Sequence, residues 1–149
     1  MITLNDTQVG KVGEYLVCAD LILKGYIAFP SEQGLHYDVV LSIKNKLYKV
    51  QVKTTRKPIP VPQRKNRTEK YCVNIRRCGK GGRKSYEEND VDIFAIVALD
   101  TKTIAYLKTS EAKQTMFFLP EDGIVAKKKH GGITVKCKKL SDYKLENIL

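Results

Sequence analysis

The sequence has no long apolar run, no secretory leader and no paired cysteines, and each absence excludes a class of protein. No stretch reaches the length of a membrane span, and the amino end has no basic start followed by an apolar segment. The four cysteines, which form no Cys-x-x-Cys pair, are Cys18, Cys72, Cys78 and Cys137. We therefore expect a cytoplasmic protein with reduced thiols and no membrane partner.

Acidic residues are also scarce, because 16 Asp and Glu stand against 27 Lys and Arg and leave a net charge of +11. Such an excess suggests a polyanionic partner, either nucleic acid or an anionic surface. The length of 149 residues and the apolar content of 42% suit a single domain, 1–149, with a real hydrophobic core.

The beginning of the chain predicts a helix and then a strand. Apolar residues recur at helical spacing over 5–24, where Asn5 and Thr7 are both suitable N-caps and Gly25 is a suitable terminator. A short strand is expected at 26–30, where the apolar residues end at a proline.

The rest of the chain predicts strands and loops. Further strands are expected at 37–43, 47–54, 71–75, 91–99, 104–108 and 133–138, and a short helix within 109–118. The first two of these strands alternate polar and apolar residues and form a hairpin, and the nearly continuous apolar run at 91–99 indicates a buried central strand. The fold class is therefore a mixed α/β domain in which one long helix precedes a three-strand meander.

The predicted hairpin fixes which side chains lie together. If the apolar residues of its two strands share one buried face, Val39 must oppose an even-numbered residue such as Val50. That register places Asp38 opposite Gln51, or opposite Lys53 after a slip of two. In either case Asp38, Gln51 and Lys53 project from one face within side-chain reach.

A carboxylate, an amide oxygen and a lysine on one face suit phosphodiester hydrolysis. Asp38 and the Gln51 amide oxygen can bind a hard divalent cation such as Mg²⁺ or Mn²⁺, and the backbone carbonyl of Val52 can join them. Such a cation polarises phosphate and helps to deprotonate water. Lys53 can orient the attacking water or stabilise the charge that grows on the phosphoryl oxygens.

These positions resemble the PD-(D/E)XK nuclease superfamily, whose fold is restriction-endonuclease-like. Its members place an aspartate near the start of one strand and a (D/E)-x-K triplet on the next, matched here by Asp38 and by Gln51-Val52-Lys53. Many also carry a glutamate on the preceding helix, where this chain has Glu14. Over about residues 7–56 the chain is most similar to bacterial group I intron-encoded homing endonucleases. The resemblance implies catalytic roles for Glu14, Asp38, Gln51 and Lys53, and a metal held by Asp38, Gln51, Val52 and Glu14.

The sequence departs from the family pattern at two positions. Tyr37 precedes Asp38 where the motif has a proline that does no chemistry. Gln51 replaces an acid and removes one negative charge from the metal site, so the affinity for a cation should be lower. Because some superfamily members use glutamine there, we interpret Gln51 as a working variant, although an inactivated copy would have the same sequence.

Basic residues concentrate after the hairpin, in a segment that we call the basic insertion, residues 54–84. It holds eleven Lys or Arg and one acid, Glu69. We expect it to form an arm or hairpin that lies against DNA, with a disordered basic loop as the alternative. The candidate DNA-contacting residues are Arg56, Lys57, Arg64, Lys65, Arg67, Arg76, Arg77, Lys80, Arg83 and Lys84. A smaller basic group at 127–129, 136, 138 and 139 could extend the footprint.

Other candidate motifs fail on spacing. Gly79-Lys80-Gly81-Gly82 lacks the pattern of a phosphate-binding loop. The cysteines and His130 match no common zinc site. His36 is close to Asp38 in sequence, and we interpret it as a surface histidine at the end of a strand.

The resemblance implies a sequence-specific double-strand DNA endonuclease that acts as a homo-oligomer, a dimer or a tetramer, because cutting both strands usually needs two active sites. Three alternatives stay open: a Holliday-junction resolvase, a DNA-binding module that has lost cleavage, and a basic RNA-binding protein. The last of these would not explain why Asp38, Gln51 and Lys53 share a face.

Overall fold

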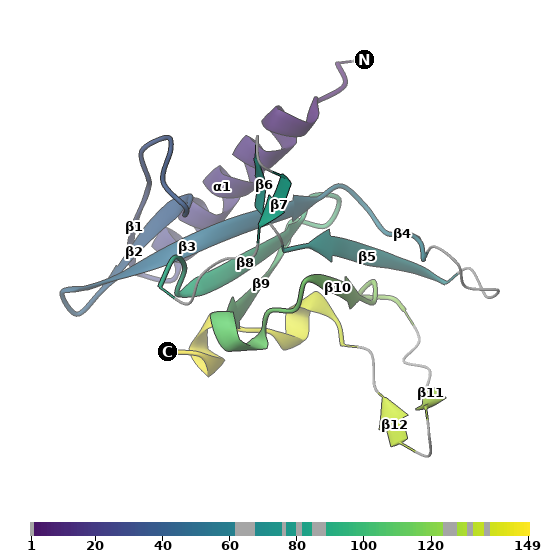
Figure 1. Cartoon of the computed structure of the whole chain (residues 1–149). Helices are drawn as coiled ribbons and strands as arrows, with labels where there is room; N and C mark the ends of the chain where they lie inside the picture. Colours follow the sequence, from purple (N-terminus) through teal and green to yellow (C-terminus); the bar gives the residue numbers. More distant parts are fainter. Residues whose placement is uncertain are drawn as a thin grey trace.

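The computed structural model describes residues 2–61, 68–75, 89–123 and 138–149, together with the backbone of four short strands that lie between these ranges. Its centre is a five-stranded sheet in the order β1-β2-β3-β8-β9. These strands are β1 (Ile27–Pro30), β2 (Val39–Ile43), β3 (Lys46–Thr55), β8 (Ile93–Ala98) and β9 (Thr103–Lys108). Figure 1 shows the helix α1 (Asp6–Leu23) lying across one face of this sheet.

The opposite face is covered by a smaller sheet in the order β10-β5-β4 and by the segment around Leu140. The elements on this side are β4 (Ile59–Pro60), β5 (Glu69–Asn74), η1 (Thr109–Glu111), β10 (Thr115–Phe118) and η2 (Leu140–Asp142). The last element, η3 (Leu145–Asn147), packs Leu145 into the cluster that α1 covers. Two isolated hairpins complete the chain, β6 (Arg77–Gly79) with β7 (Gly82–Lys84) and β11 (Lys128–His130) with β12 (Ile133–Val135). The predicted α/β fold, with one long helix before a three-strand meander, is confirmed.

The start of α1 is fixed by a capping box. The Asn5 side chain accepts a bond of 2.9 Å from the backbone N–H of Gln8, and the Gln8 side chain accepts one of 2.9 Å from the backbone N–H of Asn5. Asn5 is therefore the N-cap, which decides between the two candidates that the sequence left open. The helix ends before Gly25, whose φ of +88° lies in the left-handed region that favours glycine.

The hairpin of β2 and β3 has the predicted register. Val39 is paired with Val50, and the two-residue turn at Lys44 and Asn45 has φ angles of 47° and 64°. Positive φ at both central residues is the geometry of a type I′ turn, whose twist matches that of the two strands. The pairing continues by one residue, because the backbone N–H of Asp38 donates to Val50 O at 2.9 Å.

Strand β8 is the most buried element, since all six of its residues are buried, as the apolar run predicted. It runs parallel to β3 and pairs Gln51 with Phe94. Alternate residues of the sheet face two separate apolar clusters. One cluster lies under α1 and includes Val50 and Val52, and the other lies under the smaller sheet and includes Phe94.

The prediction of a short helix within 109–118 is wrong for most of this segment. The chain makes only the three-residue 3-10 turn η1, and Thr115–Phe118 form strand β10, which pairs antiparallel with β5. Phe118 is buried in the cluster under the smaller sheet. The partner strand is about forty residues away in the sequence, so local periodicity could not reveal this pairing.

No helix in the described part of the chain is both long enough and apolar enough to cross a membrane. The expected strand at 133–138 is observed as Ile133–Val135, and the two residues that follow lie outside the described ranges.

At Gly13 the helix α1 lies very close to strand β3. A Cβ atom added there would lie 1.8 Å from Thr54 Oγ1 on β3, closer than any real contact. Gly10, one turn earlier on the same helix, has no atom within 4 Å of the corresponding position. The absence of a side chain at Gly13 therefore sets the distance between α1 and β3.

We predict that Gly13→Ala lowers the free energy of unfolding by about 1–3 kcal/mol, because the added methyl group pushes the helix away from β3. Gly10→Ala is the matched control and should raise stability by about 0.5–1 kcal/mol, because alanine has the higher helix propensity. Urea unfolding followed by circular dichroism measures both changes. Equal effects of the two substitutions would show that Gly13 has no special packing role.

Candidate active site

Asp38 lies at the point where β2 begins and is held on both sides by the backbone. Its N–H donates to Val50 O, and its carbonyl accepts from Ser31 N, both at 2.9 Å. The partner of the first β2 residue, Val39, is Val50, whereas β3 continues to Thr55. Asp38 therefore stands beside a stretch of β3 that extends past the end of its antiparallel partner.

The Asp38 carboxylate binds that stretch of β3. Its Oδ2 atom accepts from the backbone N–H of Val52 at 2.9 Å and from Gln51 Nε2 at 2.6 Å. Gln51 Nε2 also lies 3.5 Å from the carbonyl oxygen of Val52, which brings that oxygen to the same place. The structure thus brings Asp38 and Gln51 together, as the hairpin register predicted, and adds a bond from the backbone of Val52.

Lys53 and Glu14 bring charge to Asp38 from the two faces of the sheet. Lys53 projects from β3 on the same face as Gln51, and its positive charge lowers the pKa of Asp38. Glu14 is on α1, directly after Gly13, and its negative charge raises that pKa. Gln51 thus contacts Asp38 directly, and Glu14 and Lys53 are close enough for their charges to change its pKa.

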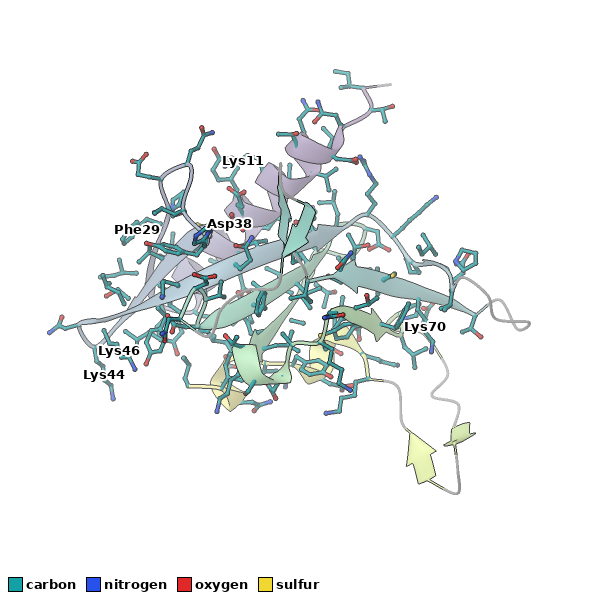
Figure 2. The ribbon with its side chains drawn as sticks, viewed as in Figure 1. Lys11, Phe29, Asp38, Lys44, Lys46 and Lys70 are labelled. Carbon is teal, nitrogen blue, oxygen red and sulfur yellow. The ribbon has the colours of Figure 1, made fainter. Side chains whose placement is uncertain are left out.

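Lys11 is a further charged residue of the site that the sequence analysis did not identify. Its Nζ atom lies 2.5 Å from Glu14 Oε2, and its charge lowers the pKa of Asp38. Figure 2 labels Lys11 on α1 and Asp38 at the start of β2. Glu14 raises the pKa of Lys11 through this hydrogen bond and its charge. The three-residue spacing of Lys11 and Glu14 on a predicted helix was the signal that could have revealed the pair.

Burial raises the pKa of the Asp38 carboxyl above its ordinary value. The hydrogen bond from the Val52 N–H opposes this effect, Glu14 adds to it, and Lys53 and Lys11 oppose it. The net shift is upward, so the folded protein holds the ionised carboxylate less favourably than water does. A buried carboxylate whose pKa is raised in this way lowers the stability of the fold, and such groups are typical of functional sites.

The oxygen atoms of the site suit a hard divalent cation. Two carboxylates and one backbone carbonyl are the ligand types that Mg²⁺ and Mn²⁺ prefer, and they come from Asp38, Glu14 and Val52. Gln51 turns its amide nitrogen toward Asp38, so its oxygen could join them only if the amide rotates by half a turn. The described residues contain no group of three His, Cys, Asp or Glu that could hold a metal, so the fit depends on the carbonyl and amide oxygens.

Of the residues that we expect to contact DNA, the structure describes the side chains of Arg56 and Lys57, which lie near the amino end of α1. Arg56 bonds the carbonyl of Leu4 and the carboxylate of Asp6, each at 2.9 Å, and this ion pair is exposed. Lys57 lines a groove that α1 forms with the end of β3. Backbones are described for Arg77, Arg83 and Lys84 in the β6–β7 hairpin, whereas Arg64, Lys65, Arg67, Arg76 and Lys80 lie outside the described residues.

Two of three comparisons with known proteins found similar proteins. The profile of the PD-(D/E)XK endonuclease family matches residues 4–138, most of the chain. Among solved structures the chain is similar to a bacterial homing endonuclease, I-Ssp6803I, with a TM-score of 0.64 and 18% sequence identity. The match covers 80% of this chain and 81% of the homing endonuclease, and it shows a common fold. Among curated proteins there is no match.

We predict that Asp38→Asn stabilises the protein at neutral pH. Because the pKa of Asp38 is raised on folding, its favourable contribution is present below the ordinary pKa of an aspartate and is lost as the pH rises through the folded value. Asparagine keeps the shape and carries no charge. The melting temperature at pH 7 should rise by roughly 2–4 °C per kcal/mol gained, and the gain should shrink at acidic pH.

The control for this measurement is Asp122→Asn, at an exposed position in a turn. It should leave the melting temperature nearly unchanged at both pH values. A lower melting temperature of Asp38→Asn at pH 7 would mean that the bonds of the carboxylate outweigh the cost of burying it.

Proposed function

The chain belongs to the PD-(D/E)XK endonuclease family, and we propose from this premise that it is a sequence-specific, homing-type endonuclease of double-stranded DNA. The observation that carries the proposal is the cluster at the start of β2. There Asp38 binds Gln51 and the Val52 N–H, while Glu14 and Lys53 act on its charge from opposite faces. Apart from Gln51, which stands where the motif has an acid, these are the residue types of the family motif.

Nucleases of this family generally use divalent metal ions, and we propose Mg²⁺ or Mn²⁺ for this chain. Asp38, Glu14 and the Val52 carbonyl would hold the ion, with Gln51 joining after rotation of its amide. The bound ion supplies polarisation of the phosphate and acidification of water. The Val52 N–H orients the Asp38 carboxylate for the ion. Its hydrogen bond fixes one carboxylate oxygen and leaves the other for a ligand.

Lys53 supplies the positive charge that phosphodiester hydrolysis requires. Its backbone is fixed in the sheet, because Lys53 itself pairs with Ile96 of β8. A lysine held in this way can orient the attacking water, or stabilise the charge that develops on the phosphoryl oxygens, without further rearrangement.

Binding of DNA would involve the basic insertion. The described side chains of Arg56 and Lys57 follow β3 directly, so DNA bound by the insertion would continue toward the site. We propose phosphate and base contacts for the same set as above, Arg56, Lys57, Arg64, Lys65, Arg67, Arg76, Arg77, Lys80, Arg83 and Lys84. We also propose a homo-oligomer, a dimer or a tetramer, because cutting both strands usually needs two active sites.

We predict that plasmid DNA carrying a recognition site is cut in the presence of Mg²⁺, and that Asp38→Ala and Lys53→Ala each lower the rate by on the order of 10²–10³-fold. Lys113→Ala is the matched control, because Lys113 is an exposed lysine outside the site, and it should cut normally. Gel electrophoresis of the products measures the rates. Normal cutting by both site variants would refute the assignment.

The same assay distinguishes two other activities. Cleavage of four-way junctions but not of linear DNA would indicate a resolvase. Salt-sensitive DNA binding without nicking in any divalent cation would indicate a binding module, an outcome that Gln51 in place of an acid makes worth testing.

We predict that Gln51→Glu tightens the binding of Mn²⁺ on the order of tenfold, equivalent to about 1.4 kcal/mol. The substitution adds a carboxylate where the amide now contacts Asp38 at 2.6 Å. Gln51→Met, which has no oxygen to offer, should not tighten the binding. Isothermal titration of the protein alone measures both affinities, and weaker binding by Gln51→Glu would exclude this position from the metal site.

A further inference from the structure

The Lys11–Glu14 ion pair occupies an oxygen that the proposed metal would need. The Lys11 Nζ to Glu14 Oε2 distance is 2.5 Å, and among the described residues Lys11 is the hydrogen-bond partner of the Glu14 side chain. The Glu14 side chain is 18% exposed, whereas that of Lys11 is 46% exposed. The carboxylate is therefore held in place, and the ammonium can leave toward solvent.

A second ion pair on α1, between Lys24 and Asp20, has a structural role and differs from the Lys11–Glu14 pair. Lys24 bonds Asp20 Oδ1 at 2.9 Å, and Asp20 Oδ2 accepts from the buried Tyr106 hydroxyl at 2.5 Å. Both Asp20 oxygens thus have partners from the chain, and the bond to Tyr106 joins α1 to β9. In the other pair Lys11 binds Glu14, and the charges of both residues act on the nearby Asp38. The chain therefore places an exposed cation between α1 and an acidic site.

The charges at the site balance without any ion. Glu14 and Asp38 carry two negative charges, and Lys11 and Lys53 carry two positive ones, all close enough to change the pKa of Asp38. A divalent cation bound between the two acids would lie next to the Lys11 ammonium and would repel it. Lys53 extends from the central sheet, whereas Lys11 is a flexible side chain on the helix surface, so Lys11 is the cation that would move.

We propose that Lys11 is a placeholder for the divalent cation: it holds Glu14 at the site and is displaced when a metal ion binds there. This inference rests on the proposed function, because it assumes the metal site. In this view Lys11 is a positioning residue that competes with the metal for Glu14. The competition is weak, because an exposed ion pair contributes little and its lysine is readily solvated.

The test is a titration of the whole chain with Mn²⁺ in the absence of DNA, followed by isothermal calorimetry. Lys11→Met should bind Mn²⁺ roughly two- to fivefold more tightly than the wild type, the range that an exposed ion pair can account for. Lys24→Met, which removes the other lysine ion pair of α1, should bind as the wild type does. Circular dichroism establishes that all variants are folded, and Lys11→Gln repeats the test with a polar side chain.

A double-mutant cycle separates displacement from a general effect of charge. In the Glu14→Gln background, Lys11→Met should give no further tightening, because Lys11 no longer has a carboxylate to hold. Tightening of the same size in both backgrounds would overturn the inference, since it would reflect only the lost positive charge. Unchanged or weaker binding by Lys11→Met, or no Mn²⁺ binding by any variant, would overturn it as well.

The proposed function can fail separately from this inference. If Lys11→Met binds Mn²⁺ more tightly only when Glu14 is present, yet no DNA substrate is cut, the placeholder stands and the nuclease assignment falls. If DNA is cut in a metal-dependent manner, but the wild type and Lys11→Met bind Mn²⁺ equally tightly, the nuclease assignment stands and the placeholder role of Lys11 falls.

Discussion

The pairing of β2 with β3 is the constraint on which the rest of the site depends. Because Val39 opposes Val50, Asp38 must lie beside Gln51, where β3 continues beyond the start of its partner. The Val52 N–H is then directed at a side chain rather than at another strand, and the Asp38 carboxylate accepts it. A shift of the register by one residue would turn Asp38 to the other face of the sheet and separate it from Gln51.

The site is costly for the protein, and the surrounding charges reduce that cost. Burial disfavours the ionised Asp38, and Glu14 adds to the penalty. The Val52 N–H and the two lysines compensate only in part, so the carboxylate remains easier to protonate than one in water. A cation with two positive charges would remove this penalty, which is why an arrangement unfavourable to stability is favourable to metal binding.

A close contact between the helix and the sheet helps to build the site. Gly13 lets α1 approach Thr54, and the residues on either side of it on the helix surface, Lys11 and Glu14, are thereby placed near Asp38. Strand β3 carries the other half, because its alternate residues Gln51 and Lys53 project from the face away from α1. The site is therefore built from two layers, the helix α1 and the central sheet. It lies where the antiparallel pairing of β2 with β3 stops.

The sequence by itself determined the local features: the capped helix, the hairpin register that joins Asp38 to Gln51, and the buried strand β8, because each depends on residues close together in the chain. The tertiary structure decided what depends on distant contacts. Asp92 also precedes a strand and accepts from a β3 backbone N–H, that of Lys49, at 2.8 Å. Asp92 is exposed, whereas Asp38 is partly buried and accepts from Gln51 as well. The packing of α1 adds a further difference, because the helix brings the charges of Glu14 and Lys11 to Asp38. Strand β10 was missed for the same reason, since its partner β5 lies far away in the sequence and hydrophobic periodicity carries no information about such pairing.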